Sequence, residues 1–452
     1  MSRNADWAAR DLAVVWHPCT QMKDHERELP LVPIARARGA WLEDYDGRRY
    51  LDAISSWWTC LLGHADPRLD AALRNQLGTL DHVLLAGFTH APVVELSEAL
   101  VARTPHGLAR CFYADSGSAT VEIALKMSFH WWRNQGHPAK TRFIALEGGY
   151  HGETLGALSV GDLGLYKASY APLMLEQLTA PSPDTYLAAA GESARDRALR
   201  AATALERLLE QHADQVCALI LEPRVQCAAG MRMHDPEYLR LARALCDRFG
   251  VHLIADEIAV GFGRSGTMFA CEQAGIRPDF LLLGKGLTGG YLPLSVLLTT
   301  DDIYQAFYDD YATLRGFLHS HSYTGNPLAC RVALATLAAL DADATLLRNH
   351  ERAAALWAAV APLADHPRVG QVRQAGMIVA VELARDGRGR TAYDWRERRG
   401  LIAYRHALAR GVLLRPLGNV LYLMPPYCVT TDEIGLLGQT MAECVAVATA
   451  AP

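Results

Sequence analysis

The 452-residue chain has no uninterrupted apolar stretch of the roughly 18 residues that a membrane-spanning helix needs. Residues 1–10 are polar and mixed in charge, and they do not contain the apolar core of a signal peptide. No run of basic residues is present, and a formal net charge of -5 gives no electrostatic reason to bind nucleic acid. These absences predict a cytoplasmic protein with neither a membrane nor a nucleic acid as its partner.

Cysteine spacing excludes two further classes of site. None of the ten cysteines forms a C-x-x-C pair, so the sequence predicts neither a zinc knuckle nor a redox dithiol, and we expect no metal site. In a cytoplasmic protein of this size, most of these cysteines are expected to be reduced thiols that pack in the interior.

Apolar strand-like runs alternate with amphipathic helical segments through the middle of the chain. With 50% hydrophobic residues, the chain can bury a large core and form more than one domain. The alternation predicts an α/β fold with a mostly parallel central sheet and helices on both faces. The expected strands are 110–114, 141–146, 216–221, 251–255, 280–283 and 294–299, and the main helices are 119–133, 194–212 and 236–249.

The two ends of the chain have a different character. Residues 41–53 contain two short apolar runs around Asp46-Gly47, which predicts a β-hairpin. After a helix expected at 328–340, the chain mixes helices with short strands such as 377–383 and 420–424. We therefore expect a large domain over residues 64–331 and a smaller α+β domain built from residues 1–63 and 332–452.

Two charged residues stand at the ends of apolar strands in the expected sheet. Asp256 follows the run 251–255, and Lys285 follows the run 280–283 between two glycines. A buried aspartate needs a cation or hydrogen-bond donors, and a desolvated lysine has a lowered pKa. Pyridoxal phosphate requires both groups, a lysine for its aldehyde carbon and an acid for its pyridine nitrogen. The alternatives are a locally paired aspartate and a solvated lysine. A P-loop is excluded because the residues around Lys285 do not have the G-x-x-x-x-G-K-[ST] spacing.

Two glycine-containing turns extend this pattern. The segment 115–119 (DSGSA) joins a strand to a helix, and the N–H groups at a helix start favour an anion such as phosphate. The segment 147–152 (EGGYHG) also follows a strand and presents Tyr150, whose ring can stack on a flat heterocycle. Taken singly, an ordinary helix N-cap and a packing tyrosine explain these two segments equally well.

The order of these features resembles the fold-type I pyridoxal phosphate enzymes, in the branch of the class III aminotransferases. Longer matches are DEIAVGFGRSG at 256–266, GKGLTGGYLPLS at 284–295 and YTGNPLAC at 323–330. The resemblance extends from about Trp16 to Tyr427. It implies the fold-type I transferase fold, pyridoxal 5'-phosphate as the cofactor, and a homodimer with shared active sites.

Shorter segments resemble the members of this family that aminate 8-amino-7-oxononanoate in biotin biosynthesis. They imply transfer of an amino group from S-adenosylmethionine to that keto acid, which gives 7,8-diaminononanoate. The segments are WHP at 16–18, SSWW at 55–58, YADSGS at 113–118, GYHG at 149–152, GMRM at 230–233 and LRPLG at 414–418.

The resemblance also implies roles for single residues around the cofactor. Lys285 bonds to the cofactor and moves the substrate proton, and Asp256 pairs with the pyridine nitrogen. Gly117 and Ser118 hold the phosphate, and Ser322 reaches the phosphate of the partner subunit. The expected cofactor-binding residues are Gly117, Ser118, Tyr150, Asp256, Lys285, His321 and Ser322, of which Lys285, Asp256 and Tyr150 are the expected catalytic residues.

For the substrates, the resemblance places Trp57 and Tyr150 in the pocket wall. Arg415 matches the arginine that binds the carboxylate of the keto acid in a bidentate pair. Arg264 matches a residue near the amino substrate, or else it only ties its loop together. The expected substrate-binding residues are Cys19, Trp57, Tyr150, Arg264, Lys285, Ser320 and Arg415.

The chain departs from this pattern at positions that bear on the amino donor. Cys19 follows the first His-Pro, where enzymes that use S-adenosylmethionine often carry tyrosine, and Glu153 stands where aspartate is common. The segment HSHSYT at 319–324 is closer to relatives that use lysine. Lysine is therefore the second possible donor. The sequence also leaves open a general ω-amine:pyruvate or ornithine-type aminotransferase, an aminomutase of the glutamate-semialdehyde type and an inactive cofactor-binding regulator.

Overall fold

The computed structural model describes residues 2–387 and 389–450, and the chain divides into two compact units. Unit 1 comprises residues 1–67 and 350–452, and unit 2 comprises residues 68–349. The expected division at 63/64 and 331/332 differs from this chiefly at helix α11 (Pro327–Ala342). That helix stays with unit 2 because it packs against α4 (Ala91–Val101) and the short helix η5 (Lys285–Thr288).

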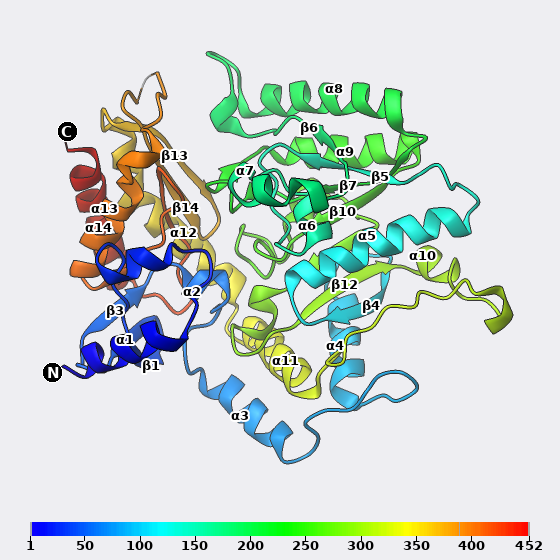
Figure 1. Ribbon diagram of the computed structural model, residues 1–452, viewed down its shortest axis with the longest axis horizontal. Helices are drawn as coiled ribbons and strands as arrows, with labels where there is room; N and C mark the ends of the chain where they lie inside the picture. The colour runs from blue at the N-terminus through cyan, green and yellow to red at the C-terminus, as the bar shows by residue number, and fades with distance from the viewer. Residues whose placement is uncertain (1, 388, 451–452) are drawn as a thin grey trace. The chain divides into compact units, whose positions relative to one another are not determined.

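Unit 2 is built on a seven-stranded sheet with the strand order β4-β12-β11-β10-β7-β5-β6 (Figure 1). The strands from β11 to β6 pair in parallel, whereas β12 is antiparallel to both of its neighbours. The mostly parallel sheet predicted from the sequence is confirmed. The strands are β4 (Leu108–Ala114), β5 (Arg142–Leu146), β6 (Leu178–Ala180), β7 (Val216–Leu221), β10 (His252–Asp256), β11 (Phe280–Leu283) and β12 (Ser295–Thr300).

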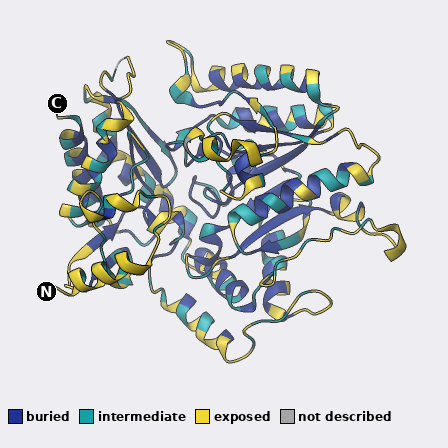
Figure 2. Cartoon of the chain, viewed as in Figure 1, coloured by how far each residue is buried: buried dark blue, intermediate teal, exposed yellow. Residues whose placement is uncertain are grey.

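The sheet is covered on both faces. All six residues of β7 and all four of β11 are buried, and Figure 2 shows the central strands in dark blue. A strand buried on both sides has no polar face, which is why these segments read as continuous apolar runs instead of alternating ones. Helix α5 (Gly117–Asn134) packs its apolar residues into the core formed with these strands. Helices α8 (Ala194–His212) and α9 (Pro236–Phe249) pack against each other, and α9 contacts β10.

Shorter elements complete unit 2, and helices α3 and α12 join it to unit 1. Strands β8 and β9 form a separate two-stranded ribbon. These elements are α3 (Pro67–Leu77), α6 (Leu155–Ser159), α7 (Gly164–Lys167), η2 (Ala168–Leu173), η3 (Thr185–Leu187), β8 (Val225–Gln226), β9 (Arg232–Met233), η4 (Ala270–Ala274), α10 (Asp301–Gln305), η6 (Tyr311–Thr313) and α12 (Thr345–Val360).

Unit 1 contains two small sheets, ordered β1-β2-β3-β15 and β13-β14-β16. The predicted hairpin forms between β2 and β3, and Gly47 in its turn has a φ of +88°. Strand β15 pairs in parallel with β3, so segments from both ends of the chain share one sheet. The strands are β1 (Ile34–Arg38), β2 (Trp41–Asp44), β3 (Arg49–Asp52), β13 (Val369–Ala375), β14 (Ile378–Leu383), β15 (Val412–Leu413) and β16 (Val420–Leu423).

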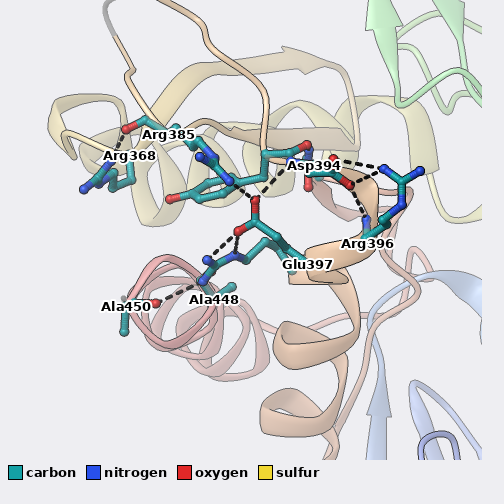
Figure 3. A network of polar contacts seen from close by, with 10 residues as sticks. Arg368, Arg385, Asp394, Arg396, Glu397, Ala448 and Ala450 are labelled. Carbon is teal, nitrogen blue, oxygen red and sulfur yellow. Dashed lines mark hydrogen bonds and ion pairs between the residues drawn. The ribbon is translucent and has the colours of Figure 1, made fainter. Parts of the chain in front are cut away.

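A network of arginines and carboxylates fastens the C-terminal helices of unit 1 (Figure 3). Glu397 accepts hydrogen bonds from Arg385 and from Arg399, whose Nη2 lies 2.6 Å away. The other guanidinium nitrogen of Arg399 donates to the carbonyls of Ala448 and Ala450, at 3.1 and 3.0 Å. These carbonyls at the end of a helix lack partners within it, so the arginine satisfies them. The helices of unit 1 are α1 (Arg3–Val14), η1 (Met22–Glu26), α2 (Ser55–Trp58), η7 (Ala361–Asp365), η8 (Trp395–Glu397), α13 (Arg399–Ala409) and α14 (Thr431–Thr449).

The cysteines have the state and the packing expected from the sequence. All ten cysteines are free thiols, and seven of them are buried. Among the helices formed by residues 2–387 and 389–450, none is both long enough and apolar enough to cross a bilayer.

Candidate active site

Lys285 begins the short helix η5, just after strand β11. Its φ of +42° is a left-handed conformation that a residue with a side chain rarely adopts, and such strain gathers at functional sites. Burial lowers the pKa of the Lys285 amine, although the nearby Asp256, Cys227 and Glu222 raise it in part. A lowered pKa increases the fraction of neutral amine, which is the nucleophilic form.

Asp256 is the last residue of β10, the parallel neighbour of β11, so it lies at the same sheet edge from which the chain continues to Lys285. Its side chain is buried, and its Oδ1 accepts the N–H of Ile258 at 3.1 Å. Its Oδ2 lies 2.7 Å from Nδ1 of His151, which is also buried. The histidine supplies the partner that a buried carboxylate requires. The role of His151 was not predicted from the sequence.

Glu222 is a second buried carboxylate at this edge of the sheet. It directly follows β7, and its two carboxylate oxygens accept the N–H groups of Tyr150 and Cys227, both at 3.0 Å. Burial raises the pKa of Glu222 to about 7, and the charge of Asp256 acts in the same direction, whereas His151 opposes it. Sequence reasoning missed this residue. Its position directly after an apolar run of the sequence, as for Asp256, was the available signal.

Replacing Glu222 with glutamine should change the pH dependence of stability. The pKa of this carboxyl is raised from 4.5 to about 7 on folding, so between these values the unfolded chain has lost a proton that the folded chain keeps. Stability therefore falls as pH rises through this window, by about 3 kcal/mol for this group. The Glu222→Gln variant lacks this loss, and its free energy of unfolding relative to wild type should rise between pH 4.5 and pH 7. Urea unfolding of both proteins across this range measures the difference, and parallel curves would contradict the assignment.

The turn expected to hold a phosphate lies at the start of the 18-residue helix α5. The Ser118 hydroxyl accepts the N–H groups of Glu153 and Thr154, at 3.1 and 3.0 Å, which joins this turn to the Tyr150 segment. A Cβ atom added to Gly117 would lie 3.0 Å from two side-chain carbons of Ile258, so the site needs glycine for its close packing. The first N–H groups of a long helix favour a bound anion.

Tyr150 connects the buried carboxylate of Glu222 to the segment at Glu153, which is hydrogen-bonded to the Ser118 turn. Its backbone is held by Glu222, and its hydroxyl donates to Oε1 of Glu153 at 3.0 Å. Unit 2 thus brings together five predicted residues and two that were not predicted. The predicted residues are Gly117, Ser118, Tyr150, Asp256 and Lys285, and the additional ones are His151 and Glu222.

The remaining predicted residues of unit 2 have different surroundings. Arg264 is almost completely buried, in the loop after β10. Ser320 and Ser322 are exposed. Between them, Nδ1 of His321 lies 3.3 Å from a carboxylate oxygen of Asp115, just before the phosphate turn.

In unit 1, Trp57 and Arg415 lie against each other, with the guanidinium carbon 4.1 Å from the centroid of the indole ring. Such a cation–π contact holds the guanidinium over the ring. An arginine held in this way can receive a carboxylate through two parallel hydrogen bonds. Cys19, the other predicted residue of this unit, is exposed and has a φ of +53°.

The indole ring of Trp57 is presented by an unusual turn. Ser55, Ser56, Trp57 and Trp58 have φ values of 51°, 44°, 70° and 73°, so the SSWW motif forms one left-handed helical turn. A left-handed conformation costs about 1–2 kcal/mol for each residue that has a side chain. This turn therefore needs stabilisation from its surroundings.

Comparison with known proteins connects this geometry to a family. The family model described as aminotransferase class-III matches residues 22–445. The adenosylmethionine-8-amino-7-oxononanoate aminotransferase of Helicobacter pylori is 45% identical over 440 residues and covers 96% of each chain. The protein of that name from Geobacter sulfurreducens is 42% identical, over 96% of this chain and 95% of its own.

Solved structures agree with these relatives. The crystal structure of the adenosylmethionine-8-amino-7-oxononanoate aminotransferase of Methanocaldococcus jannaschii superposes with a TM-score of 0.92 at 35% identity, over 98% of this chain and 99% of its own. An omega transaminase from Pseudomonas jessenii in complex with PMP has a TM-score of 0.93 at 29% identity, over 98% of both chains.

Proposed function

Because the chain belongs to the class III aminotransferases, which are pyridoxal phosphate enzymes, we propose that it transfers an amino group to 8-amino-7-oxononanoate, with S-adenosylmethionine as the donor. The observation that carries this proposal is the near full-length similarity to relatives whose name states the reaction. The proposed product is 7,8-diaminononanoate, an intermediate of biotin biosynthesis, and the proposed compartment is the cytoplasm.

The residues of unit 2 fit pyridoxal phosphate. Lys285 offers an amine of lowered pKa, and Asp256 is a buried carboxylate that can pair with a protonated ring nitrogen. The α5 start at Gly117 and Ser118 offers N–H groups to the phosphate, and Tyr150 offers a ring to the pyridine face. When bound, the cofactor supplies an electron sink for the carbon that loses its proton.

Lys285 is the proposed acid and base of the reaction. Its Nζ takes the proton from the carbon that bears the amino group and delivers a proton to the cofactor carbon. The lowered pKa keeps a larger share of this amine neutral than an exposed lysine would have at the same pH. His151 and the N–H of Ile258 hold the side chain of Asp256 in one orientation, in which it can pair with the ring nitrogen of the cofactor.

Arg415 is the proposed binding group for the carboxylate of the keto acid. Its guanidinium lies over the ring of Trp57, and a bidentate pair with the carboxylate fixes one end of the long substrate. This pair gives selectivity for acceptors that carry a carboxylate far from the reacting carbonyl.

The amino donor is tested by mixing the holoenzyme with one amine at a time. We expect S-adenosylmethionine to change the absorbance of the cofactor rapidly in this half-reaction. Lysine, ornithine and alanine should change the absorbance far more slowly. A fast change with lysine would assign lysine as the donor, the outcome that Cys19 and the segment 319–324 favour. A change with alanine alone would overturn the biotin-pathway function in favour of a general ω-amine:pyruvate aminotransferase.

A homodimer with shared active sites is the proposed assembly. Ser320 and Ser322 are exposed on this chain, which suits residues that reach the phosphate of a partner subunit. Sedimentation of the holoenzyme measures the assembly directly.

An aminomutase, which belongs to a different reaction class, would rearrange a single substrate without any second amine.

A further inference from the structure

The carboxylate of Asp52 accepts hydrogen bonds from the left-handed turn that carries Trp57 and from the residue before it. Asp52, the last residue of β3, has no exposed surface. Its Oδ1 accepts the N–H of Ser56 at 2.9 Å and that of Ile54 at 3.3 Å. Its Oδ2 accepts the hydroxyl of Ser56 at 2.7 Å and lies 2.9 Å from Nε2 of His64. Two of these contacts join Asp52 to Ser56 in the turn, one joins it to Ile54 just before the turn, and one joins it to His64 after the turn.

This group of aspartate, histidine and serine is not a hydrolytic triad. In a triad the histidine lies between the serine and the acid and takes the serine proton. Here the Ser56 hydroxyl donates to the same carboxylate oxygen that His64 contacts, and the distance from Ser56 Oγ to His64 Nε2 is 3.5 Å. The arrangement is suited to holding a backbone conformation.

The other side of the turn is hydrogen-bonded to Tyr422 in strand β16 and to Met424, the residue that follows this strand. The Ser55 hydroxyl donates to the carbonyl of Met424 at 2.8 Å, and the indole N–H of Trp58 donates to the hydroxyl of Tyr422 at 3.0 Å. Ser55 and Trp58 are buried, whereas 40% of Trp57 is exposed. These bonds anchor the neighbours of Trp57 and leave Trp57 as the exposed residue of the turn, with the Arg415 guanidinium over its ring.

We propose that Asp52 and His64 are positioning residues for the carboxylate-binding end of the substrate site. They hold the left-handed turn so that Trp57 supports Arg415 in the orientation that receives a carboxylate. This inference rests on the proposed function, in which Arg415 binds the keto acid.

The test compares Asp52→Asn with wild-type holoenzyme. Asparagine cannot accept hydrogen bonds through both side-chain atoms, so the turn loses contacts and Trp57 no longer holds Arg415 in place. We expect the KM for 8-amino-7-oxononanoate to rise roughly tenfold, with kcat within about twofold of wild type. The cofactor absorbance should be unchanged, because the groups proposed to hold the cofactor belong to unit 2.

Asp44→Asn is the matched control. Asp44 ends the neighbouring strand β2, is almost fully buried, and accepts the N–H groups of Arg48 and Asp46 at 2.9 and 3.0 Å. These bonds hold the hairpin turn and not the segment 54–58. We expect Asp44→Asn to lower the melting temperature about as much as Asp52→Asn does. Its KM for 8-amino-7-oxononanoate should equal that of wild type. An equal rise in KM for both variants would reduce Asp52 to a merely structural role and overturn the proposal.

Two further measurements keep the test decisive. His64→Gln keeps a side-chain donor and should behave like wild type, whereas His64→Leu should raise the KM as Asp52→Asn does. Amide hydrogen exchange of the segment 54–60 reports on the turn itself. It should be faster in Asp52→Asn and unchanged in Asp44→Asn, and unchanged exchange in Asp52→Asn would refute the positioning role. If the wild-type enzyme does not aminate the keto acid, the proposed function is refuted. The amide hydrogen exchange of residues 54–60 would still decide whether Asp52 holds the turn.

Discussion

Replacing Lys285 with alanine should lower the rate of amino transfer roughly ten-thousandfold, because one side chain serves both as the nucleophile and as the acid and base. The variant should also lose the covalent bond to the cofactor. Borohydride reduction followed by mass spectrometry measures that bond. In wild type the cofactor mass should appear on the peptide that contains Lys285, and in Lys285→Ala on no peptide.

The chain contains its own control for this assignment. Lys140 is buried, and burial lowers the pKa of its amine too. Its Nζ donates to the carbonyls of Ala213, Val216 and Gly250 at 2.6 to 2.9 Å, and three donated hydrogen bonds require the ammonium form, which has no lone pair for a nucleophilic attack. We expect no cofactor on Lys140. A reduced cofactor there, or a bond that survives in Lys285→Ala, would show that a lowered pKa misidentified the nucleophile.

A small amine added to the solution separates the two roles of Lys285. The cavity left by alanine can admit methylamine or ethylamine, which can move a proton but cannot tether the cofactor to the chain. Partial recovery of the rate that depends on amine concentration would indicate lost proton transfer. Absence of recovery together with loss of cofactor absorbance would indicate that the covalent bond mainly retains the cofactor.

The central strands β7, β10, β11 and β12 could be predicted from the sequence because both of their faces are buried, whereas the short strands β6, β8 and β9 were not predicted. The apolar runs of the central strands are continuous, and the polar residue that ends each run therefore stands out. That contrast led to Asp256 and Lys285. The antiparallel direction of β12 could not be predicted in the same way, because an apolar run has the same composition whichever way it points.

Glu222 and His151 were missed for a different reason. His151 looks ordinary in its glycine-rich turn, and the place of Glu222 after an apolar run was the one local signal for this pair. Their meaning comes from the pairing of β5 with β7 and of β7 with β10, which brings residues far apart in the chain to one sheet edge. Pairing of this kind is a tertiary property that local patterns do not contain.

The left-handed turn at SSWW is the clearest limit of local reasoning. None of its four residues is a glycine, so backbone preferences predict right-handed or extended conformations for all of them. The bonds that impose the turn come from Asp52 on one side and from Tyr422 and Met424 on the other. The last two lie far along the chain from their partners in the turn, with separations of 364 and 369 positions. The resemblance to a family pointed to Trp57 and Arg415, but the physical reason for their pairing came only from the structure.

Replacing Arg415 with alanine should raise the KM for the keto acid about 10- to 100-fold, since a hydrogen bond to a charged group contributes roughly 1.5–3 kcal/mol. The kcat should change little, because a carboxylate remote from the reacting carbonyl is bound equally in the ground state and the transition state. Initial rates at saturating donor and varied keto acid measure both constants. Arg415→Lys keeps the charge but loses the planar fork, so its KM should lie between those of wild type and alanine.

Two comparisons give this experiment its specificity. Arg410 lies at the end of α13 and pairs with Glu443 at 3.0 Å, so Arg410→Ala removes an arginine of the same unit without touching the Trp57 contact. Its KM should equal that of wild type. The amide of the keto acid, which has no carboxylate, should be as poor an acceptor for wild type as for Arg415→Ala. If Arg415→Ala instead lowers the rate with the acid and the amide by the same factor, the arginine does not recognise the carboxylate, and selectivity for this keto acid must come from other residues.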